Sequence, residues 1–147
     1  MTQVQVARFQ DLDVTTLYAL LRLRVDVFVV EQQCPYPELD GRDTEPETLH
    51  LWSDDDGVVL GYLRLLADPE GARIGRVCVA MEGRGRGIAE DLMHAAVARC
   101  AGPVVLDAQA HLSGWYERLG FVVAGPRFVE DGIANVPMRL PTNASPV

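Results

Sequence analysis

The chain has 147 residues, of which 48% are hydrophobic and 23% charged, and its formal net charge at pH 7 is −8. This length and composition predict one globular domain over residues 1–141, followed by a short C-terminal tail over residues 142–147. The negative charge excludes general binding to nucleic acid, whose phosphates need a basic surface. No apolar run has the length of a membrane span or of a secretion signal.

The cysteines indicate a reducing compartment. Cys34, Cys78 and Cys100 lie far apart and form no C-x-x-C pair. We therefore expect neither a disulfide framework nor a zinc site. Together with the absence of a secretion signal, this predicts a cytoplasmic protein that binds no metal and no membrane.

Apolar periodicity defines the elements that we expect along the chain. Asp11 or Asp13 caps the first helix, and residues 31–46 form a loop long enough to be functional. The order predicts an α+β domain with mixed α/β character, built on one sheet. The expected elements are a strand over Val4–Phe9, a helix from the cap to about Val27, strands over Leu49–Ser53, Val58–Leu66 and Arg73–Ala80, a helix over Ile88–Cys100, a strand over Val104–Ala110, a short helix over His111–Leu119, and strands over Phe121–Ala124 and Val136–Leu140.

The stretch Arg84-Gly-Arg-Gly-Ile-Ala89 joins an expected strand to an expected helix. The first N–H groups of a helix have no intrahelical partner, and glycine lets the backbone approach a phosphate closely. The two arginines add fixed cations. The stretch therefore predicts a pyrophosphate site, with a plain glycine-rich turn as the alternative. It matches neither a P-loop, which needs Lys-Ser or Lys-Thr, nor a dinucleotide fingerprint.

Three motifs carry a resemblance to a known superfamily: Val77-Cys-Val79, the turn Arg84–Ala89, and Trp115-Tyr-Glu-Arg-Leu-Gly-Phe121. The chain resembles the GCN5-related N-acetyltransferases (GNAT), whose phosphate motif is Gln or Arg, two residues, Gly, one residue, then Gly or Ala. More narrowly, it resembles the ElaA-like acyltransferases over residues 4–140. The narrower likeness rests on Val27–Tyr36, Asp40–Asp43, Ala108–His111 and Glu130–Ile133.

The resemblance implies a fold and a co-substrate. The fold is a twisted, mixed and mostly antiparallel sheet of about six to seven strands, flanked by helices and splayed between strands 4 and 5. The co-substrate is acetyl-CoA, with its pyrophosphate on the turn and its pantetheine arm paired to the preceding strand. The residues implied to bind it are Val77, Cys78, Val79, Arg84, Gly85, Arg86, Gly87, Ile88 and Ala89.

The resemblance also implies an activity, namely transfer of an acetyl group from acetyl-CoA to a primary amine by direct attack in a ternary complex. A small molecule or a peptide supplies the amine. A homodimer is a further expectation. The alternative is a non-catalytic acyl-CoA-binding sensor or interaction module, which needs the same turn. The residues expected to contact the acceptor are Arg24, Glu31, Asp40 and Gln109.

Two of the residues expected to contact the acceptor come from an acidic loop, and a third is a charged residue within an apolar helix stripe. Glu31 and Asp40 belong to the loop, whose carboxylates favour a cationic acceptor. Arg24 lies in the apolar stripe of the first expected helix. It either lines a pocket or extends its stem along the core to reach water.

Tyr116 matches the superfamily tyrosine that protonates the leaving thiolate as a general acid. A phenol can do this because its ordinary pKa exceeds that of a thiol. The alternative is that Tyr116 belongs to the buried stripe of a short helix, with Leu112 and Leu119.

In some relatives a glutamate on the strand before the turn acts as the general base. Around that position this chain has arginine. His111 and Glu31 are the leading candidate bases, His111 because imidazole titrates nearest to neutral pH. Asp40 and Glu130 are the alternatives.

Overall fold

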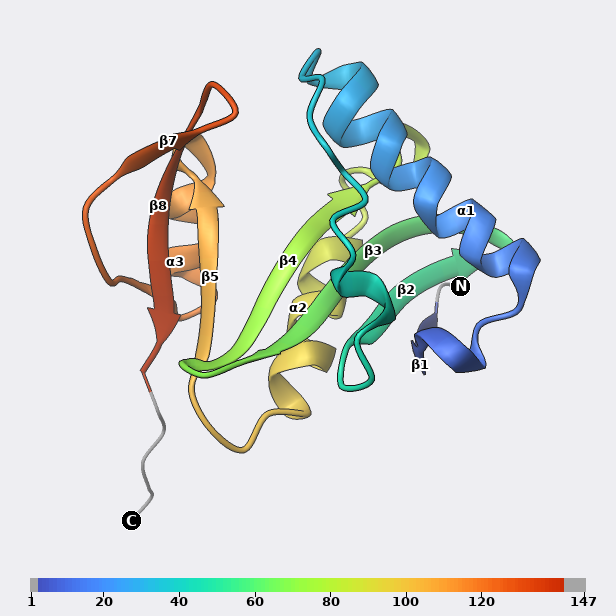
Figure 1. Ribbon diagram of the computed structural model, residues 1–147, viewed down its shortest axis with the longest axis horizontal. Helices are drawn as coiled ribbons and strands as arrows, with labels where there is room; N and C mark the ends of the chain where they lie inside the picture. The colour runs from blue at the N-terminus through green and yellow to red at the C-terminus, as the bar shows by residue number, and fades with distance from the viewer. Residues whose placement is uncertain (1–2, 142–147) are drawn as a thin grey trace.

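A computed structural model of the chain describes residues 3–141, and the expected tail over residues 142–147 lies outside them. Helices α1 (Val14–Val25) and α2 (Ile88–Ala98) lie on opposite faces of one sheet, and the short helix α3 (Ser113–Arg118) packs against β5 (Figure 1). The strands are β1 (Gln3–Arg8), β2 (Leu49–Asp55), β3 (Val58–Asp68), β4 (Gly71–Val79), β5 (Val104–Gln109), β6 (Val122–Val123), β7 (Phe128–Glu130) and β8 (Ile133–Leu140).

The described strands form one sheet in the order β1-β2-β3-β4-β5-β8-β6, and β7 also pairs with β8. All pairs are antiparallel except β4 with β5. The predicted fold class is confirmed, but the sheet has eight strands rather than six or seven. The additional strand, β7, is three residues long, too short for alternation to reveal. Its signal is the turn Asp131-Gly132, where both residues have positive φ, as in two-residue hairpin turns.

Strands β4 and β5 stay paired only over a short stretch. Ala72–Ile74 pair with Val104–Leu106, and beyond them the two strands diverge (Figure 1). The predicted splay between the fourth and fifth strands is confirmed. As a consequence, the β5-facing edge of β4 after Ile74 has no strand partner within residues 3–141.

A β-bulge reshapes β4 where it leaves β5. Gly75 pairs with Arg64 of β3, and Cys78 pairs with Tyr62, so the two β4 residues between them oppose a single residue of β3. One of the two, Arg76, has a φ of 55°, which side chains with a Cβ rarely adopt. Bulges of this kind bend a strand and re-aim its side chains.

Helix α1 begins where the sequence predicts. The Asp13 carboxylate accepts a hydrogen bond from the Thr16 N–H at 2.7 Å, which satisfies one of the free donors of the first turn. The helical path continues beyond the predicted end near Val27 through a π-helical turn over Asp26–Glu31. Such turns are rare and frequently lie at functional sites.

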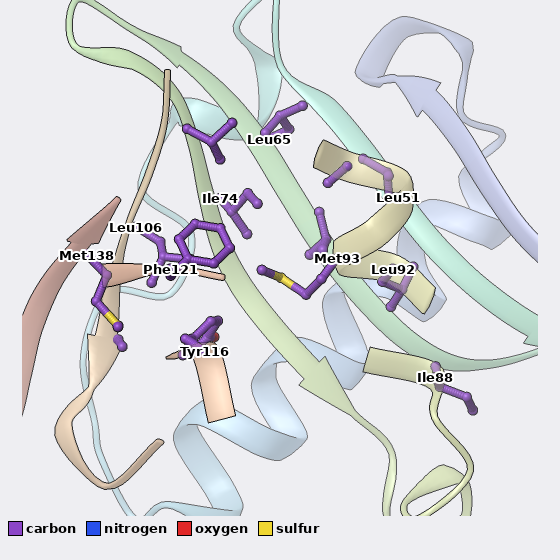
Figure 2. Packing of buried hydrophobic residues seen from close by; sticks show 14 of the residues in the cluster. Leu51, Leu65, Ile74, Ile88, Leu92, Met93, Leu106, Tyr116, Phe121 and Met138 are labelled. Atoms are coloured by element: carbon purple, nitrogen blue, oxygen red, sulfur yellow. The ribbon is translucent and has the colours of Figure 1, made fainter. Parts of the chain in front are cut away.

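The main hydrophobic core lies between the sheet and α2, and a smaller one lies under α1. Leu92 and Met93 of α2 are buried in the main core, and Tyr116 and Phe121 extend it to the α3 side (Figure 2). The smaller cluster contains Leu20, Leu23, Tyr62 and Cys78. Because β3 is covered on both faces, its residues 60–66 are all buried, as in central strands of two-sided sheets.

Candidate active site

A cavity of about 590 Å³ opens where β4 and β5 diverge, and we call it the slot. Its walls come from the π-helical turn, the loop after it, the bulged part of β4, the end of β5, helix α3 and the β7–β8 hairpin. A smaller hollow adjoins it at Val79, Arg84 and Trp115, and the turn before α2 forms the rest of that hollow. Segments far apart in the sequence therefore meet at the slot.

The structure brings most of the predicted site residues to this region. Arg24, Asp40 and Arg86 lie in neither wall. The slot wall contains Glu31, Val77, Cys78, Val79, Arg84, Ala89, Gln109, His111 and Tyr116, and the adjoining hollow adds Gly85, Gly87 and Ile88.

The turn before α2 presents a run of free backbone donors. Gly85 and Gly87 have φ of 78° and 76°, and Gly87 is the N-cap of α2. No N–H group of residues 85–90 donates a hydrogen bond to any residue that the structure describes. Because the helix N-terminus also carries a partial positive charge, this stretch is suited to binding an anion.

The two arginines of the turn are already paired. Arg84 donates to the Glu31 carboxylate at 2.6 and 2.9 Å and to the Val79 carbonyl at 3.1 Å. Arg86 donates to the Asp55 carboxylate at 3.4 Å and lines neither the slot nor the adjoining hollow. The hydrogen bonds from Arg84 hold the pKa of the Glu31 carboxyl below its usual range. A carboxylate stabilised in this way is a weaker base, so Glu31 is the poorer of the two candidate bases.

The end of β4 offers its backbone rather than its side chains. Val77 and Val79 line the slot, and their β5-facing edge lacks a strand partner within the described chain. Cys78 is 5% exposed and belongs to the cluster under α1. Burial raises the pKa of the Cys78 thiol, so this thiol stays protonated and is not suited to act as a nucleophile.

Tyr116 lies in the slot wall and in the main core at once. Its ring packs edge-on against Trp115 and Phe121, with centroid distances of 4.8 and 6.2 Å. The residue is 7% exposed, and burial raises the pKa of its phenol to about 12. Because the hydroxyl stays protonated at neutral pH, it can donate a proton or a hydrogen bond inside the slot.

The end of β5 contributes Gln109, and the 3₁₀ turn that follows it, Ala110–Leu112, contributes His111. Gln109 exchanges hydrogen bonds with Gln32, which follows the π-helical turn, at 3.3 and 3.4 Å. This amide pair links two segments that both line the slot. His111 also lines the slot and is exposed, with no hydrogen bond to another described residue, so its imidazole is accessible to a ligand.

Arg24 fits neither of the two alternatives that the sequence leaves open. It is 1% exposed and lies outside the slot wall. Its guanidinium donates to Glu38 at 2.7 Å and to Asp43 at 2.8 Å. Both acids lie in the loop over residues 31–46, Asp43 within a 3₁₀ turn over Arg42–Thr44. Arg24 therefore ties the loop to α1 and does not reach the slot wall.

Arg24 is one member of an internal ion cluster, which we define as Arg24, Glu38, Asp40, Asp43, Arg64 and Arg76. Arg64 binds Asp40 through two nitrogens, at 2.5 and 2.9 Å, and Asp43 at 3.1 Å. Arg76 donates to Glu38 at 3.0 Å and lies over the Tyr36 ring, 5.5 Å from its centroid. Tyr36 also donates a hydrogen bond to Glu38.

The sequence predicted neither Arg64 nor Arg76 as a site residue, although both line the slot. The sequence does contain one signal for Arg64, because it is a charged residue inside the otherwise apolar run over residues 60–66. Such a residue must find a partner when it is buried.

The ion cluster makes stability depend on pH. Hydrogen bonds from Arg64 lower the pKa of Asp40. Burial alone raises the pKa of Asp43, but Arg24 and Arg64 outweigh it and lower the pKa overall. A carboxyl with a lowered folded-state pKa stabilises the fold above its unfolded pKa, near 4, and loses that contribution as pH falls through the folded value. We therefore expect the free energy of unfolding, measured in urea, to fall steadily below about pH 4.

The Asp40→Asn variant isolates part of this effect. Its unfolding free energy should fall less steeply between about pH 4 and pH 2 than that of the parent, because one linked carboxyl is gone. Glu47→Gln is the matched control, since Glu47 is exposed. A parent-like slope in Asp40→Asn would contradict the assignment.

The Acetyltransferase (GNAT) domain family matches residues 18–142 of this chain. The chain belongs to the GNAT acetyltransferase family. A crystal structure of an acyl-CoA N-acyltransferase from Pseudomonas aeruginosa is similar to this GNAT protein, with a TM-score of 0.88, 42% identity, and coverage of 95% of this chain and 99% of the other.

Escherichia coli ElaA is another similar protein. Its crystal structure matches with a TM-score of 0.89 and 36% identity, over 95% of this chain and 99% of ElaA. In sequence, ElaA is 38% identical over 148 residues, which cover 94% of this chain and 95% of ElaA. A Mycobacterium tuberculosis protein is 49% identical over 138 residues, covering 90% of this chain and 88% of the relative. The predicted ElaA-like membership is confirmed, and it supports acyl transfer from an acyl-CoA.

None of the helices within residues 3–141 is both long and apolar enough to cross a membrane. In the same residues, no group of three His, Cys, Asp or Glu side chains is placed to hold a metal ion. The cytoplasmic location and the homodimer stay predictions.

Proposed function

We propose that the protein is an N-acetyltransferase that moves an acetyl group from acetyl-CoA to a primary amine in a ternary complex. The observation that carries the proposal is the path from the free N–H groups of residues 85–90, along the unpaired edge of β4, to the Tyr116 hydroxyl. An anion site, a backbone edge and an acid then follow one another along the slot and the hollow that adjoins it.

The coenzyme end of the slot relies on backbone groups. The N–H groups of the turn would bind the pyrophosphate of the coenzyme, and the edge of Val77–Val79 would pair with its pantetheine arm. Arg84 can assist only by releasing Glu31, to which it is now bonded. Arg86 is directed to Asp55 and contributes charge rather than contact.

The reacting end holds the amine and the thioester together, which by itself supplies much of the rate. The neutral amine nitrogen forms a bond to the thioester carbonyl carbon, and the carbon–sulfur bond breaks. Tyr116 gives its proton to the leaving sulfur. His111 takes the proton that the amine nitrogen loses, and transfer of that proton from His111 back to the Tyr116 oxygen restores both groups and completes the cycle. The products are an N-acetylated amine and free CoA.

The test is a panel of primary amines, scored by release of free thiol from acetyl-CoA, propionyl-CoA and succinyl-CoA. We expect amine-dependent release that is fastest with acetyl-CoA, and intersecting double-reciprocal lines when both substrates are varied. Release from no acyl-CoA, although CoA itself binds, would instead favour the sensor or interaction module.

Replacing Gly87 with alanine tests the coenzyme end. The Cβ would meet no atom within 4 Å, so the effect comes from the φ of 76°, which costs a residue with a Cβ about 1–2 kcal/mol. Relaxation of the turn then redirects its N–H groups. We expect the Kd for CoA, measured by titration calorimetry, to rise at least about fivefold.

The matched control is Gly102→Ala, which also meets open space but has no positive φ. Its Kd for CoA should equal that of the parent. A folded Gly87→Ala protein with the parent Kd would show that the turn does not bind the coenzyme.

A further inference from the structure

The acids of the loop are not available to bind a cationic acceptor. Glu38, Asp40 and Asp43 are bonded to Arg24, Arg64 and Arg76. The internal ion cluster thus holds three carboxylates and three guanidinium groups, and its charges cancel.

The slot wall itself offers no free carboxylate near the bulge. Glu31 is paired with Arg84, and Asp107 with Arg73 at 3.1 Å. Glu130 and Asp131 lie on the exposed β7–β8 hairpin at the rim. These two carboxylates can attract the ammonium group of an amine that enters the slot. Attraction for a cation is therefore confined to the rim.

Two arginine nitrogens in the slot wall remain without a partner. The Nε of Arg64 is buried with no hydrogen-bond partner, and it alone has that status among the side-chain nitrogens and oxygens of residues 3–141. Arg64 as a whole is 3% exposed. Arg76 uses Nε and Nη2 in its bonds to Glu38 and Asp40, whereas its Nη1 bonds to no described residue.

Gly75 leaves space beside one of these donors, the Nε of Arg64. A Cβ at Gly75 would stand 4.0 Å from the Nε of Arg64. Gly75, Arg64 and Arg76 all line the slot, at the point where β4 has just left β5. The missing side chain at Gly75 thus leaves space next to the buried Nε of Arg64.

A buried guanidinium nitrogen without a partner is costly, and a carboxylate is its best partner in shape and charge. We propose that Arg64 and Arg76 bind a carboxylate of the acceptor, so that the preferred substrate is an amine that also carries a carboxylate. This inference rests on the proposed acetyltransferase function and specifies its acceptor class.

The first test compares matched acceptors that differ in one charge. β-Alanine, 4-aminobutyrate and 6-aminohexanoate are each compared with the corresponding amide, which keeps the size and the amine. We expect at least one acid to have a kcat/KM at least tenfold above that of its amide. The same acid should bind more tightly in titration calorimetry with CoA present, a readout that does not need turnover.

Two variants assign the effect to the proposed residues. Arg76→Gln should raise KM for the preferred acid about tenfold and leave the kinetics of its amide within twofold, and Arg76→Lys should restore part of the loss. Gly75→Ala leaves the ion cluster intact while filling the space beside Arg64, and it should also raise KM for the acid. Arg22→Gln is the control, because Arg22 is 75% exposed on α1.

The outcomes separate the inference from the function on which it rests. Amides accepted as well as acids would overturn the inference and leave the acetyltransferase standing. An equal fall in kcat for acid and amide in Arg76→Gln would overturn it too, since Arg76 would then act on the thioester. If no amine reacts and no acid binds, both the function and the inference fail.

Discussion

Replacing Tyr116 with phenylalanine is expected to lower kcat for acetyl transfer about 100-fold or more, the range that general-acid catalysis supplies. The phenol lies in the slot wall, and with its pKa raised to about 12 it holds its proton at neutral pH. Phenylalanine keeps the packing against Trp115 and Phe121 but removes the proton. The measurement is thiol release at saturating acetyl-CoA, together with the Kd for CoA, which should change less than twofold.

Tyr18→Phe is the matched control, because Tyr18 is 72% exposed on α1. It should leave kcat and the Kd for CoA unchanged. A Tyr116→Phe enzyme with the parent kcat would remove Tyr116 from the mechanism and leave it as a core residue. A parallel rise in the Kd for CoA would instead indicate a packing defect at α3.

Replacing Arg24 with methionine is expected to lower the free energy of unfolding by about 3–5 kcal/mol, as removal of one partner from a buried ion pair does. Methionine keeps an unbranched side chain in place of the aliphatic stem of the arginine but removes the guanidinium, which leaves Glu38 and Asp43 without one of their cations. Glu38 is 4% exposed, so water cannot replace the lost bonds. Urea titration of parent and variant at pH 7 measures the difference.

Arg22→Met is the control on the same helix, since Arg22 is 75% exposed and lies 3.9 Å from Asp26. Its effect should stay within about 0.5 kcal/mol. Adding Asp43→Asn to Arg24→Met should cost less than the two single changes combined, because the second removes a charge that the first left unpaired. Equal losses of unfolding free energy in Arg22→Met and Arg24→Met would mean that the ion cluster does not stabilise the fold more than an exposed arginine does.

Features confined to a few neighbouring residues could be predicted. The turn at Gly85 and Gly87 is one example. Its glycines indicate positive φ, and the residues directly after them indicate a helix. The Asp13 cap is another. The splay between β4 and β5 was implied by the family resemblance, and the structure adds that the two strands pair in parallel over three residues before they diverge.

The acceptor end of the slot could not be predicted in this way. The acids of the loop favoured a cationic acceptor only while their partners were unknown. The side chains that neutralise them lie 14 to 38 residues away along the chain. The register of β3 with β4 and the bulge at Arg76 bring these partners together, and no local pattern encodes that register.

The amino-acid order was therefore sufficient for the family, the fold class and the backbone conformation of the turn before α2, because each depends on motifs of contiguous residues and their backbone preferences. The chemical character of the acceptor end emerged only on folding. Charge there depends on which carboxylates and guanidinium groups pair across the sheet, and pairing is a property of distance in space rather than of position in the chain.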